Sequence, residues 1–342
     1  MTSCPSCGLT NGHPVLFTGR DHLVGAAGSF SVVCCDGCGL AFTWPQLRAE
    51  DFGSFYPETA YPAYQARGPS AGVVKTTLDA WASRRRARSV RKGPYLRYFT
   101  RSPGVLLDVG CGIGHHGAAF RERGWIVHGI EPSASAAREA ARCGLIVHCG
   151  TLRDAGAPTG PFDVVIFNHS LEHIPHPGDA LRRAHSLLRP GGEIAVAVPD
   201  FGCWQRRLFR DRWFHLDIPR HLQHFTAGTL ADLAGQAGFQ EVSVTRYASP
   251  NGLPNSVQYL LLGHLVLPQR GRSARITAVF YRLVRAITSR LPGDHLLLTA
   301  RRSRVEPPVA PPDGRHDDPN SDIVSTQSRP PEFPTRSTVS PA

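Results

Sequence analysis

The stretch that decides the fold is residues 105–114, VLLDVGCGIG, where an apolar run carrying one acid leads into a glycine-rich loop. The run predicts a buried strand, and the glycines predict a tight turn into a helix that lets the backbone approach a ligand. Working outward, apolar runs near residues 125–130, 145–148, 164–167 and 194–198 alternate with helical patterns. This alternation predicts a doubly wound α/β fold, a parallel sheet with helices on both faces.

The glycine loop predicts a nucleotide-like cofactor, and two carboxylates narrow its chemistry. Asp108 lies against the glycine turn, where a carboxylate would repel a pyrophosphate and favours a cationic ligand. Glu131 closes the second strand, where a carboxylate can accept hydrogen bonds from both ribose hydroxyls. Because Gly112, Gly114 and Gly117 also satisfy the dinucleotide fingerprint, an NAD-dependent oxidoreductase is an alternative.

Four features in order resemble the class I S-adenosylmethionine-dependent methyltransferases: residues 108–114, Glu131, residues 162–174 (FDVVIFNHSLEHI) and residues 188–192 (LRPGG). The resemblance implies a seven-stranded, mostly parallel Rossmann-like sheet whose last strand is antiparallel, with S-adenosyl-L-methionine as the cofactor. The predicted cofactor-binding residues are Asp108, Gly110, Gly112, Gly114, Glu131, Leu152 and Asn168.

The third strand departs from that family's pattern. Residues 149–154, CGTLRD, lack the acid that in many relatives directly follows this strand and binds the adenine amine. Thr151, Asp154 and the backbone of Leu152 are the alternative contacts to the adenine.

Five of the nine cysteines lie within the first 38 residues, mostly in the two glycine turns CPSCG (4–8) and CDGCG (35–39). Such paired turns predict a zinc ribbon with a structural zinc, whose four thiolates leave no open position for chemistry. The predicted ligands are Cys4, Cys7, Cys35 and Cys38, with Cys34 as an alternative to Cys35. The 27 residues between the pairs predict a hairpin. A zinc module ahead of this domain resembles the sugar C-methyltransferases and related subfamilies.

Histidines gather after the fourth and fifth strands, at the sheet edge where doubly wound folds bind ligands. The first group is residues 169–173 (HSLEH), and the second is residues 213–226 (WFHLDIPRHLQHFT). Oxygen and activated-carbon acceptors need a base with a pKa near neutral, which favours imidazole. By resemblance to the sugar C-methyltransferases, the base is His221, with His173 and His224 as the other catalytic candidates.

Two alternatives apply to the second histidine group. His215, Asp217, His221 and His224 form a candidate divalent-metal set, or the histidines only organise the loop through hydrogen bonds. Arg220 is a candidate contact for a phosphate or carboxylate on the acceptor, or an ordinary exposed arginine.

The formal net charge of +11 comes almost entirely from arginine. This charge favours acidic partners, or reflects a GC-rich genome. A nucleic-acid-binding protein with a degenerate cofactor fold is a second alternative, but the arginine run at 84–91 lacks interleaved aromatics, so nucleic acid is not an expected partner. Apolar residues and arginines at helical spacing over 272–290 predict either a lid or peripheral membrane contact.

The predicted organisation is a zinc ribbon at 1–45, a helical linker or lid at 46–100, a methyltransferase domain at 101–302 and a disordered tail at 303–342. A helical insertion is expected at 249–292. The sequence shows no export signal, and none of its apolar runs approaches the ~20 residues needed to span a membrane. A cytoplasmic enzyme is therefore expected. Its predicted reaction is methyl transfer to an oxygen or carbon of a small-molecule acceptor, with sugar- and lipid-linked acceptors both open.

Overall fold

The computed structural model describes residues 3–47, 55–56, 95–249, 251–265, 279–281, 284 and 291–304. The chain divides into one unit of Met1–Val305 and a second of Glu306–Ala342, and all described residues belong to the first unit. Most of the predicted linker at 46–100, most of the predicted helix at 272–290 and the tail beyond 304 lie outside the described residues. In the described part, no helix has the length and apolar character required to span a membrane.

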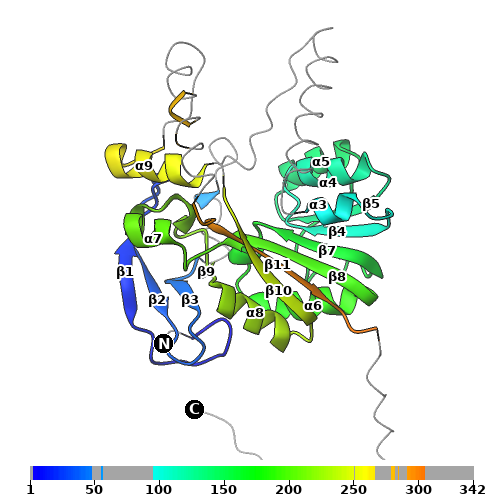
Figure 1. Ribbon diagram of the computed structural model, residues 1–342, viewed down its shortest axis with the longest axis horizontal. Helices are drawn as coiled ribbons and strands as arrows, with labels where there is room; N and C mark the ends of the chain where they lie inside the picture. Colours follow the sequence, from blue (N-terminus) through cyan, green and yellow to red (C-terminus); the bar gives the residue numbers. More distant parts are fainter. Residues whose placement is uncertain are drawn as a thin grey trace, which may run out of the picture. The chain divides into compact units, whose positions relative to one another are not determined.

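Seven strands form one sheet in the order β10-β11-β8-β7-β4-β5-β6 (Figure 1). Strands β4 to β8 are parallel, whereas β11 runs antiparallel to both β8 and β10. The doubly wound α/β sheet is therefore confirmed, including the antiparallel last strand that the resemblance implies. The strands are β4 Val105–Val109, β5 Ile126–Glu131, β6 Ile146–Cys149, β7 Phe162–Asn168, β8 Leu188–Pro199, β10 Gln240–Tyr247 and β11 His295–Arg301.

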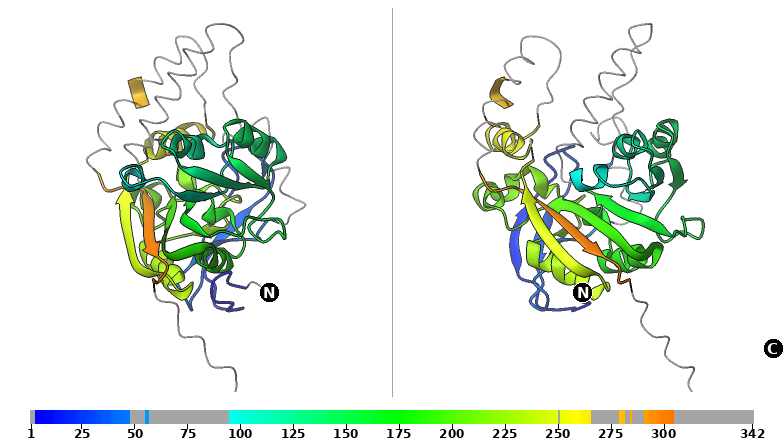
Figure 2. Two further views of the ribbon diagram at one scale, coloured as in Figure 1. Left: turned by 90° about the vertical axis from the view of Figure 1, so that its right-hand side faces the viewer. Right: turned by 45° about the vertical axis from the view of Figure 1, so that its right-hand side comes forward.

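Helices cover both faces of this sheet (Figure 2). On one face lie α3 (Leu96–Phe99), α4 (His115–Arg121) and α5 (Ala134–Arg142), and on the other lie α6 (Pro177–Leu187) and α8 (Ala227–Gln236). Parallel strands buried on both faces are apolar nearly throughout. In β4, Leu106 and Leu107 belong to the cores on opposite faces, and the buried Asp108 interrupts the apolar run.

A second, antiparallel sheet has the order β1-β2-β3-β9. The predicted hairpin between the cysteine pairs consists of β1 (Val15–Gly19) and β2 (Phe30–Cys34), and β3 (Ala41–Trp44) follows it. The fourth strand, β9 (Gln223–His224), comes from the histidine-rich segment of the large domain. Backbone pairing therefore joins the N-terminal module directly to that segment.

The stretch between β8 and β9 is mainly short helices, α7 (Trp204–Phe209), η3 (Arg210–Arg212) and η4 (Phe214–Leu216). Their apolar side chains share a buried core with the N-terminal sheet, in which Val32 and Ala41 pack with Phe201, Trp213 and Ile218. After β10, α9 (Gly252–Leu262) packs on η4 and α7. Burial of both partners fixes the N-terminal sheet beside the carboxyl edge of the large sheet.

Candidate active site

The glycine loop after β4 combines two tight contacts with one opening. Gly110, Gly112 and Gly114 all have positive φ, at +75°, +54° and +77°. A Cβ on Gly110 would lie 2.5 Å from the Cβ of Ser170, and one on Gly114 would lie 2.7 Å from the Cα of Ala140. A Cβ on Gly112 would meet no described atom within 4 Å. Gly112 therefore presents bare backbone to open space, as a ligand-binding turn requires.

Asp108, directly before this loop, is a buried acid without a partner. Its side chain is 1% exposed, and its Oδ1 has no hydrogen-bond partner among the described residues. Burial, with a smaller contribution from Glu131, raises the pKa of Asp108 to about 7. An unpaired buried carboxylate is costly, so this position favours a cationic ligand group.

Glu131 at the end of β5 ties two backbone turns together. Its Oε2 accepts from the N–H of Gly112 and its Oε1 accepts from the N–H of Ser133, each at 2.9 Å. Burial raises the pKa of Glu131, while these two N–H donors act to lower it. Each carboxylate oxygen keeps a second lone pair, so the predicted contact to ribose hydroxyls is compatible with these bonds.

The remaining predicted cofactor residues take different positions. Asn168 ends β7, and its Oδ1 accepts from the hydroxyl of Tyr95 at 3.0 Å. The Leu152 side chain is buried in the core beneath the sheet, so only its backbone is available to a ligand. Asp154 accepts from the N–H of Thr151, which closes the turn after β6. Tyr95 was missed by the sequence interpretation because it is isolated in the chain from every motif.

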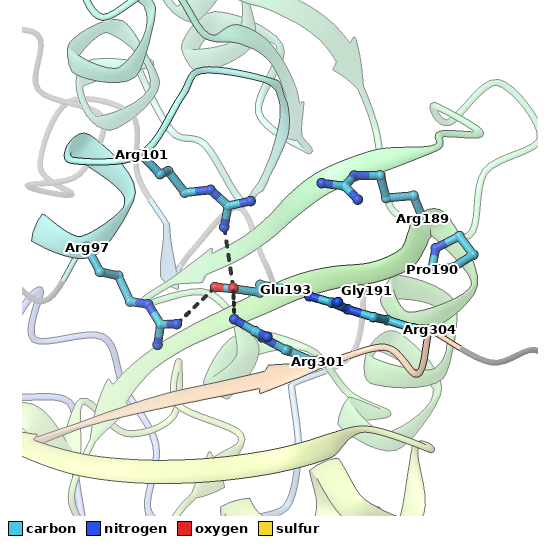
Figure 3. A pocket seen from close by; sticks show the side chains of 8 residues that line it. All are labelled: Arg97, Arg101, Arg189, Pro190, Gly191, Glu193, Arg301 and Arg304. Atoms are coloured by element: carbon cyan, nitrogen blue, oxygen red, sulfur yellow. Dashed lines mark hydrogen bonds and ion pairs between the residues drawn. The ribbon is translucent and has the colours of Figure 1, made fainter.

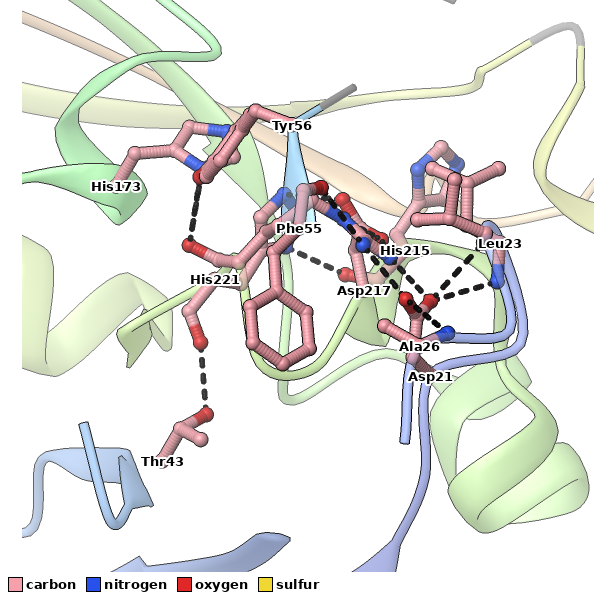
Figure 4. Close-up of polar contacts among 12 residues, drawn as sticks. Asp21, Leu23, Ala26, Thr43, Phe55, Tyr56, His173, His215, Asp217 and His221 are labelled. Atoms are coloured by element: carbon pink, nitrogen blue, oxygen red, sulfur yellow. Dashed lines mark hydrogen bonds and ion pairs between the residues drawn. The ribbon is translucent and has the colours of Figure 1, made fainter. Parts of the chain in front are cut away.

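On the acceptor side, two predicted candidates come together. His173, in η2 (Leu171–His173) just after β7, packs against His221 with ring centroids 4.7 Å apart. The His221 Nε2 lies 3.9 Å from Glu172 Oε1. It also lies 3.9 Å from Asp217 Oδ2 (Figure 4). We call Glu172, His173 and His221 the acceptor cluster.

Carbonyl oxygens lie beside the Nδ1 atoms of both imidazoles. The Nδ1 of His221 lies 3.0 Å from the carbonyl oxygen of His215, so it carries the proton and the ring keeps a lone pair on Nε2. The Nδ1 of His173 lies 3.0 Å from the carbonyl oxygen of Arg220, which favours the same tautomer, and also 3.0 Å from the hydroxyl of Tyr56, which can donate or accept. Burial, and then His173, lower the pKa of His221 to about 4, so its ring is neutral near pH 7.

Arg220 is neither an exposed arginine nor an acceptor contact, which corrects both sequence interpretations. Its guanidinium is 0% exposed and donates to both oxygens of Asp21, at 2.9 and 2.6 Å. It also donates to Asp217 Oδ1, at 2.9 Å from Nε and 2.6 Å from Nη2. These bonds join the N-terminal module to the loop that carries His221.

His224 lies away from the acceptor cluster, within the β3–β9 pair. Its Nε2 is 3.0 Å from the hydroxyl of Thr43, which itself donates to the carbonyl oxygen of His221 at 2.7 Å. The His224 ring packs on Phe201 and is buried. This geometry gives His224 a structural position at the contact between the sheets.

A second histidine cluster was missed by the sequence interpretation. His215 Nε2 lies 3.4 Å from Asp294 Oδ2, and His295 Nδ1 lies 3.1 Å from Asp294 Oδ1. Asp294 also accepts from the N–H of Ser249, at the start of the segment before α9. The cluster joins η4 to the start of β11, positions about eighty residues apart in the sequence, so no local motif could indicate it.

The four predicted zinc ligands lie together at the N-terminal module. Sγ atoms are 3.6 Å apart for Cys4 and Cys38, and 3.5 Å apart for Cys7 and Cys35. All four ligand atoms lie within 4.8 Å of one another. Cys34 is outside the group and contacts the carbonyl oxygen of Gly39.

A cavity of about 620 Å³ lies at the opposite, amino edge of the parallel strands (Figure 3). Glu193 near the start of β8 binds Arg97, Arg101 and Arg301 at 3.2, 3.4 and 2.9 Å. The residues that line the cavity are Arg97, Arg101, Arg189, Pro190, Gly191, Glu193, Arg301 and Arg304. The cavity is therefore separate from the carboxyl edge that carries the glycine loop and the acceptor cluster.

Residues 81–244 match a protein family described as a methyltransferase domain. Over 101 residues, the chain is 36% identical to the ubiquinone biosynthesis O-methyltransferase of Pseudomonas paraeruginosa (strain DSM 24068 / PA7), covering 28% of this chain and 44% of that protein. Over 133 residues, it is 34% identical to the trans-aconitate 2-methyltransferase of Mycolicibacterium gilvum (strain PYR-GCK), covering 36% and 52%. The chain thus spans about half the length of these curated relatives, or less.

Among solved structures, an S-adenosylmethionine-dependent methyltransferase from Mesorhizobium loti is similar with a TM-score of 0.45 and 21% identity, covering 63% of this chain and 100% of that chain. The family match spans the glycine loop, the end of β7 and the histidine-rich segment. The part of the chain that holds the candidate site is therefore similar to a methyltransferase domain.

Proposed function

We propose that this protein transfers the methyl group of S-adenosylmethionine to an oxygen or carbon atom of a small-molecule acceptor. When bound, the cofactor supplies an electrophilic methyl group on a sulfonium. The observation that carries the proposal is the buried, unpartnered Oδ1 of Asp108 beside the open backbone of Gly112. The names of the relatives, which concern ubiquinone biosynthesis and trans-aconitate, support a small-molecule acceptor.

The described residues fit this cofactor from end to end. Asp108 offers a carboxylate to the ammonium group, and Gly112 lets the ligand approach the backbone. Glu131 offers its remaining lone pairs to the ribose hydroxyls. The backbone at Leu152 offers the adenine contact, and Asn168 lies at the end of β7, next to the acceptor side. Each assignment follows from the charge or lone pairs that the residue presents.

A dinucleotide fits this edge less well. Its pyrophosphate would have to lie at the loop beside Asp108 and Glu131, two buried carboxylates. Like charges in a low-dielectric site repel strongly, whereas an ammonium and a sulfonium are attracted. The charge of the site therefore favours the methyltransferase over the oxidoreductase.

His221 and His173 are the proposed catalytic residues on the acceptor side. Each keeps an Nε2 lone pair that can act on the acceptor's hydroxyl or acidic C–H. We assign His224 no chemical role, because its ring is held by Thr43 between the two sheets. His221 and His173 contact the acceptor and activate it, while the glycine loop positions the cofactor.

We also propose a structural zinc ion held by Cys4, Cys7, Cys35 and Cys38. Thiolates bound at about 2.3 Å around a tetrahedral ion lie about 3.8 Å apart, close to the two Sγ separations of 3.6 and 3.5 Å. Elemental analysis of the purified chain should give one zinc per chain. The double substitution Cys4→Ser and Cys7→Ser should lose it, and zinc-free wild-type protein with a native fold would contradict the assignment.

Calorimetric titration tests the cofactor assignment directly. S-adenosylhomocysteine, which keeps the ammonium and ribose but lacks the methyl group, should bind with one site per chain. NAD, titrated under the same conditions, should show no binding. Tight binding of NAD together with no binding of S-adenosylhomocysteine would overturn the proposed function.

A further inference from the structure

The acceptor cluster brings the lone pairs of one carboxylate and two imidazoles together. Glu172 is 1% exposed, and neither of its carboxylate oxygens makes a hydrogen bond with the described residues, although the Nδ1 of His169 lies 3.5 Å from Oε1. His221 directs its Nε2 toward Glu172, and one ligand atom each from Glu172, His173 and His221 lies within 4.8 Å of the others. The contact of each Nδ1 with a carbonyl oxygen favours the tautomer whose lone pair is on Nε2. Converging lone pairs in a buried site favour a bound cation among them.

The charges around the cluster point the same way. Three carboxylates, those of Glu172, Asp217 and Asp21, are countered by a single guanidinium, that of Arg220. The local sum is therefore minus two when the imidazoles of the cluster and that of His169, 3.5 Å from Glu172, are neutral. Asp21, Arg220 and Glu172 are almost fully buried, so water cannot screen this excess. A divalent cation neutralises it completely.

We propose that Glu172, His173 and His221 bind a divalent metal ion, a site distinct from the cysteine cluster. Two imidazoles and one carboxylate are a donor set that suits zinc, manganese and related divalent ions. Two ligand atoms, each about 2.1 Å from a shared metal, lie between about 3 and 4 Å apart. The 3.9 Å between His221 Nε2 and Glu172 Oε1 falls in this range, and the widest pair needs to close by less than about 1 Å.

This set differs from the one that the sequence suggested. His215 belongs to the separate cluster around Asp294, and His224 is held at the β3–β9 contact. Asp217 lies 3.9 Å from His221 through its Oδ2, while its Oδ1 binds Arg220. Asp217 therefore adds negative charge beside the proposed ion.

The metal site, which rests on the proposed function for its role, defines the acceptor class. Three protein ligands leave positions open for a hydroxyl and a neighbouring oxygen, as in a vicinal diol or a catechol. A cation held by these residues would lower the pKa of that hydroxyl, so that the proton passes to water and the electron pair stays on oxygen. That oxygen would then take the methyl group while the C–S bond breaks and its electron pair stays on sulfur. In this inference methylation occurs at oxygen, and His221 and His173 act on the acceptor by holding the ion, which replaces their role as free bases.

Manganese titration tests the site without any enzyme activity. The full chain, with zinc retained in the cysteine cluster, is titrated with Mn²⁺ while the electron-paramagnetic-resonance signal of free Mn²⁺ is followed. Thiolates prefer zinc, so Mn²⁺ does not displace it there. We expect one Mn²⁺ per chain, bound at least about tenfold more weakly in Glu172→Gln and in His173→Asn.

His295→Asn is the matched control, because it alters the other histidine–carboxylate cluster and should leave Mn²⁺ binding unchanged. Binding of S-adenosylhomocysteine by each variant verifies that the cofactor side still folds. Absence of Mn²⁺ binding to wild type, equal binding by Glu172→Gln, or a loss confined to His295→Asn would overturn the inference. If the metal inference fails but S-adenosylhomocysteine still binds, the proposed function stands. If Mn²⁺ binds but S-adenosylhomocysteine does not, the metal site stands and the proposed function is overturned.

Discussion

Replacing Asp108 with asparagine should separate ligand binding from stability, because the two respond in opposite directions. The substitution keeps the shape of the side chain but removes its charge. In the ligand-free protein this carboxylate is buried beside Glu131, and its pKa is raised to about 7. The difference from its ordinary pKa corresponds to roughly 4 kcal/mol against folding near pH 7, at about 1.36 kcal/mol per pH unit.

Asp108→Asn removes this penalty, so the ligand-free variant should unfold at the same temperature as wild type or higher. Affinity for S-adenosylhomocysteine should fall, because the ligand's ammonium loses its counter-charge. Removing one partner of a buried charged pair costs about 2–5 kcal/mol. Since half of Asp108 is already protonated near pH 7, the lower part of that range applies, and we expect about a 30- to 150-fold weaker dissociation constant.

The assay combines calorimetry with thermal unfolding in the absence and presence of S-adenosylhomocysteine. Wild type should show a ligand-induced rise in melting temperature, and the variant should lose most of it while its ligand-free melting temperature is retained. Gly235→Ala, on α8 with open space around its Cβ position, is a suitable control that should change neither result. Unchanged affinity in Asp108→Asn, or weaker affinity accompanied by a lower ligand-free melting temperature, would refute the reasoning.

Three further predictions concern the same edge of the sheet. Because the raised pKa of Asp108 leaves it mostly neutral below about pH 7, affinity for S-adenosylhomocysteine should fall about fivefold between pH 7 and pH 6, with proton release on binding near neutral pH, both measurable by calorimetry. Arg220→Met should lower stability by about 3–5 kcal/mol, read from chemical denaturation, because it leaves two buried carboxylates unpaired. Thr43→Val should weaken acceptor turnover but spare S-adenosylhomocysteine binding, because it removes the hydroxyl's bond to the His221 carbonyl oxygen.

The large sheet could be predicted from the sequence because its signals are local. Each buried strand is a short apolar run, and each ends near a residue typical of turns, so both can be recognised in the sequence. The predicted run at 105–109 coincides with β4. The run at 125–130 matches β5 to within one residue at each end, and the run at 194–198 lies inside β8. The antiparallel last strand came from the resemblance, since nothing local distinguishes its direction.

The acceptor side could be predicted only in part, because its geometry depends on contacts between distant segments. His173 and His221 carried a local signal through their position after strands, and the structure brings them together. Arg220 carried no local signal, because its buried ion pair is with Asp21, about two hundred positions away in the sequence. The role of His224 likewise depends on strand β3, which pairs with it from the other end of the chain.

The N-terminal module and the acceptor cluster depend on each other through a narrow contact. Strand β9 is only two residues long, so two paired residues alone would hold it weakly. The Thr43 bonds to the His221 carbonyl oxygen and to the His224 ring, and the Arg220 bonds to Asp21, reinforce it. Together they fix the loop on which His221 faces Glu172, a residue of η2 in the same large domain. The N-terminal module therefore helps to hold His221 at a fixed distance from Glu172.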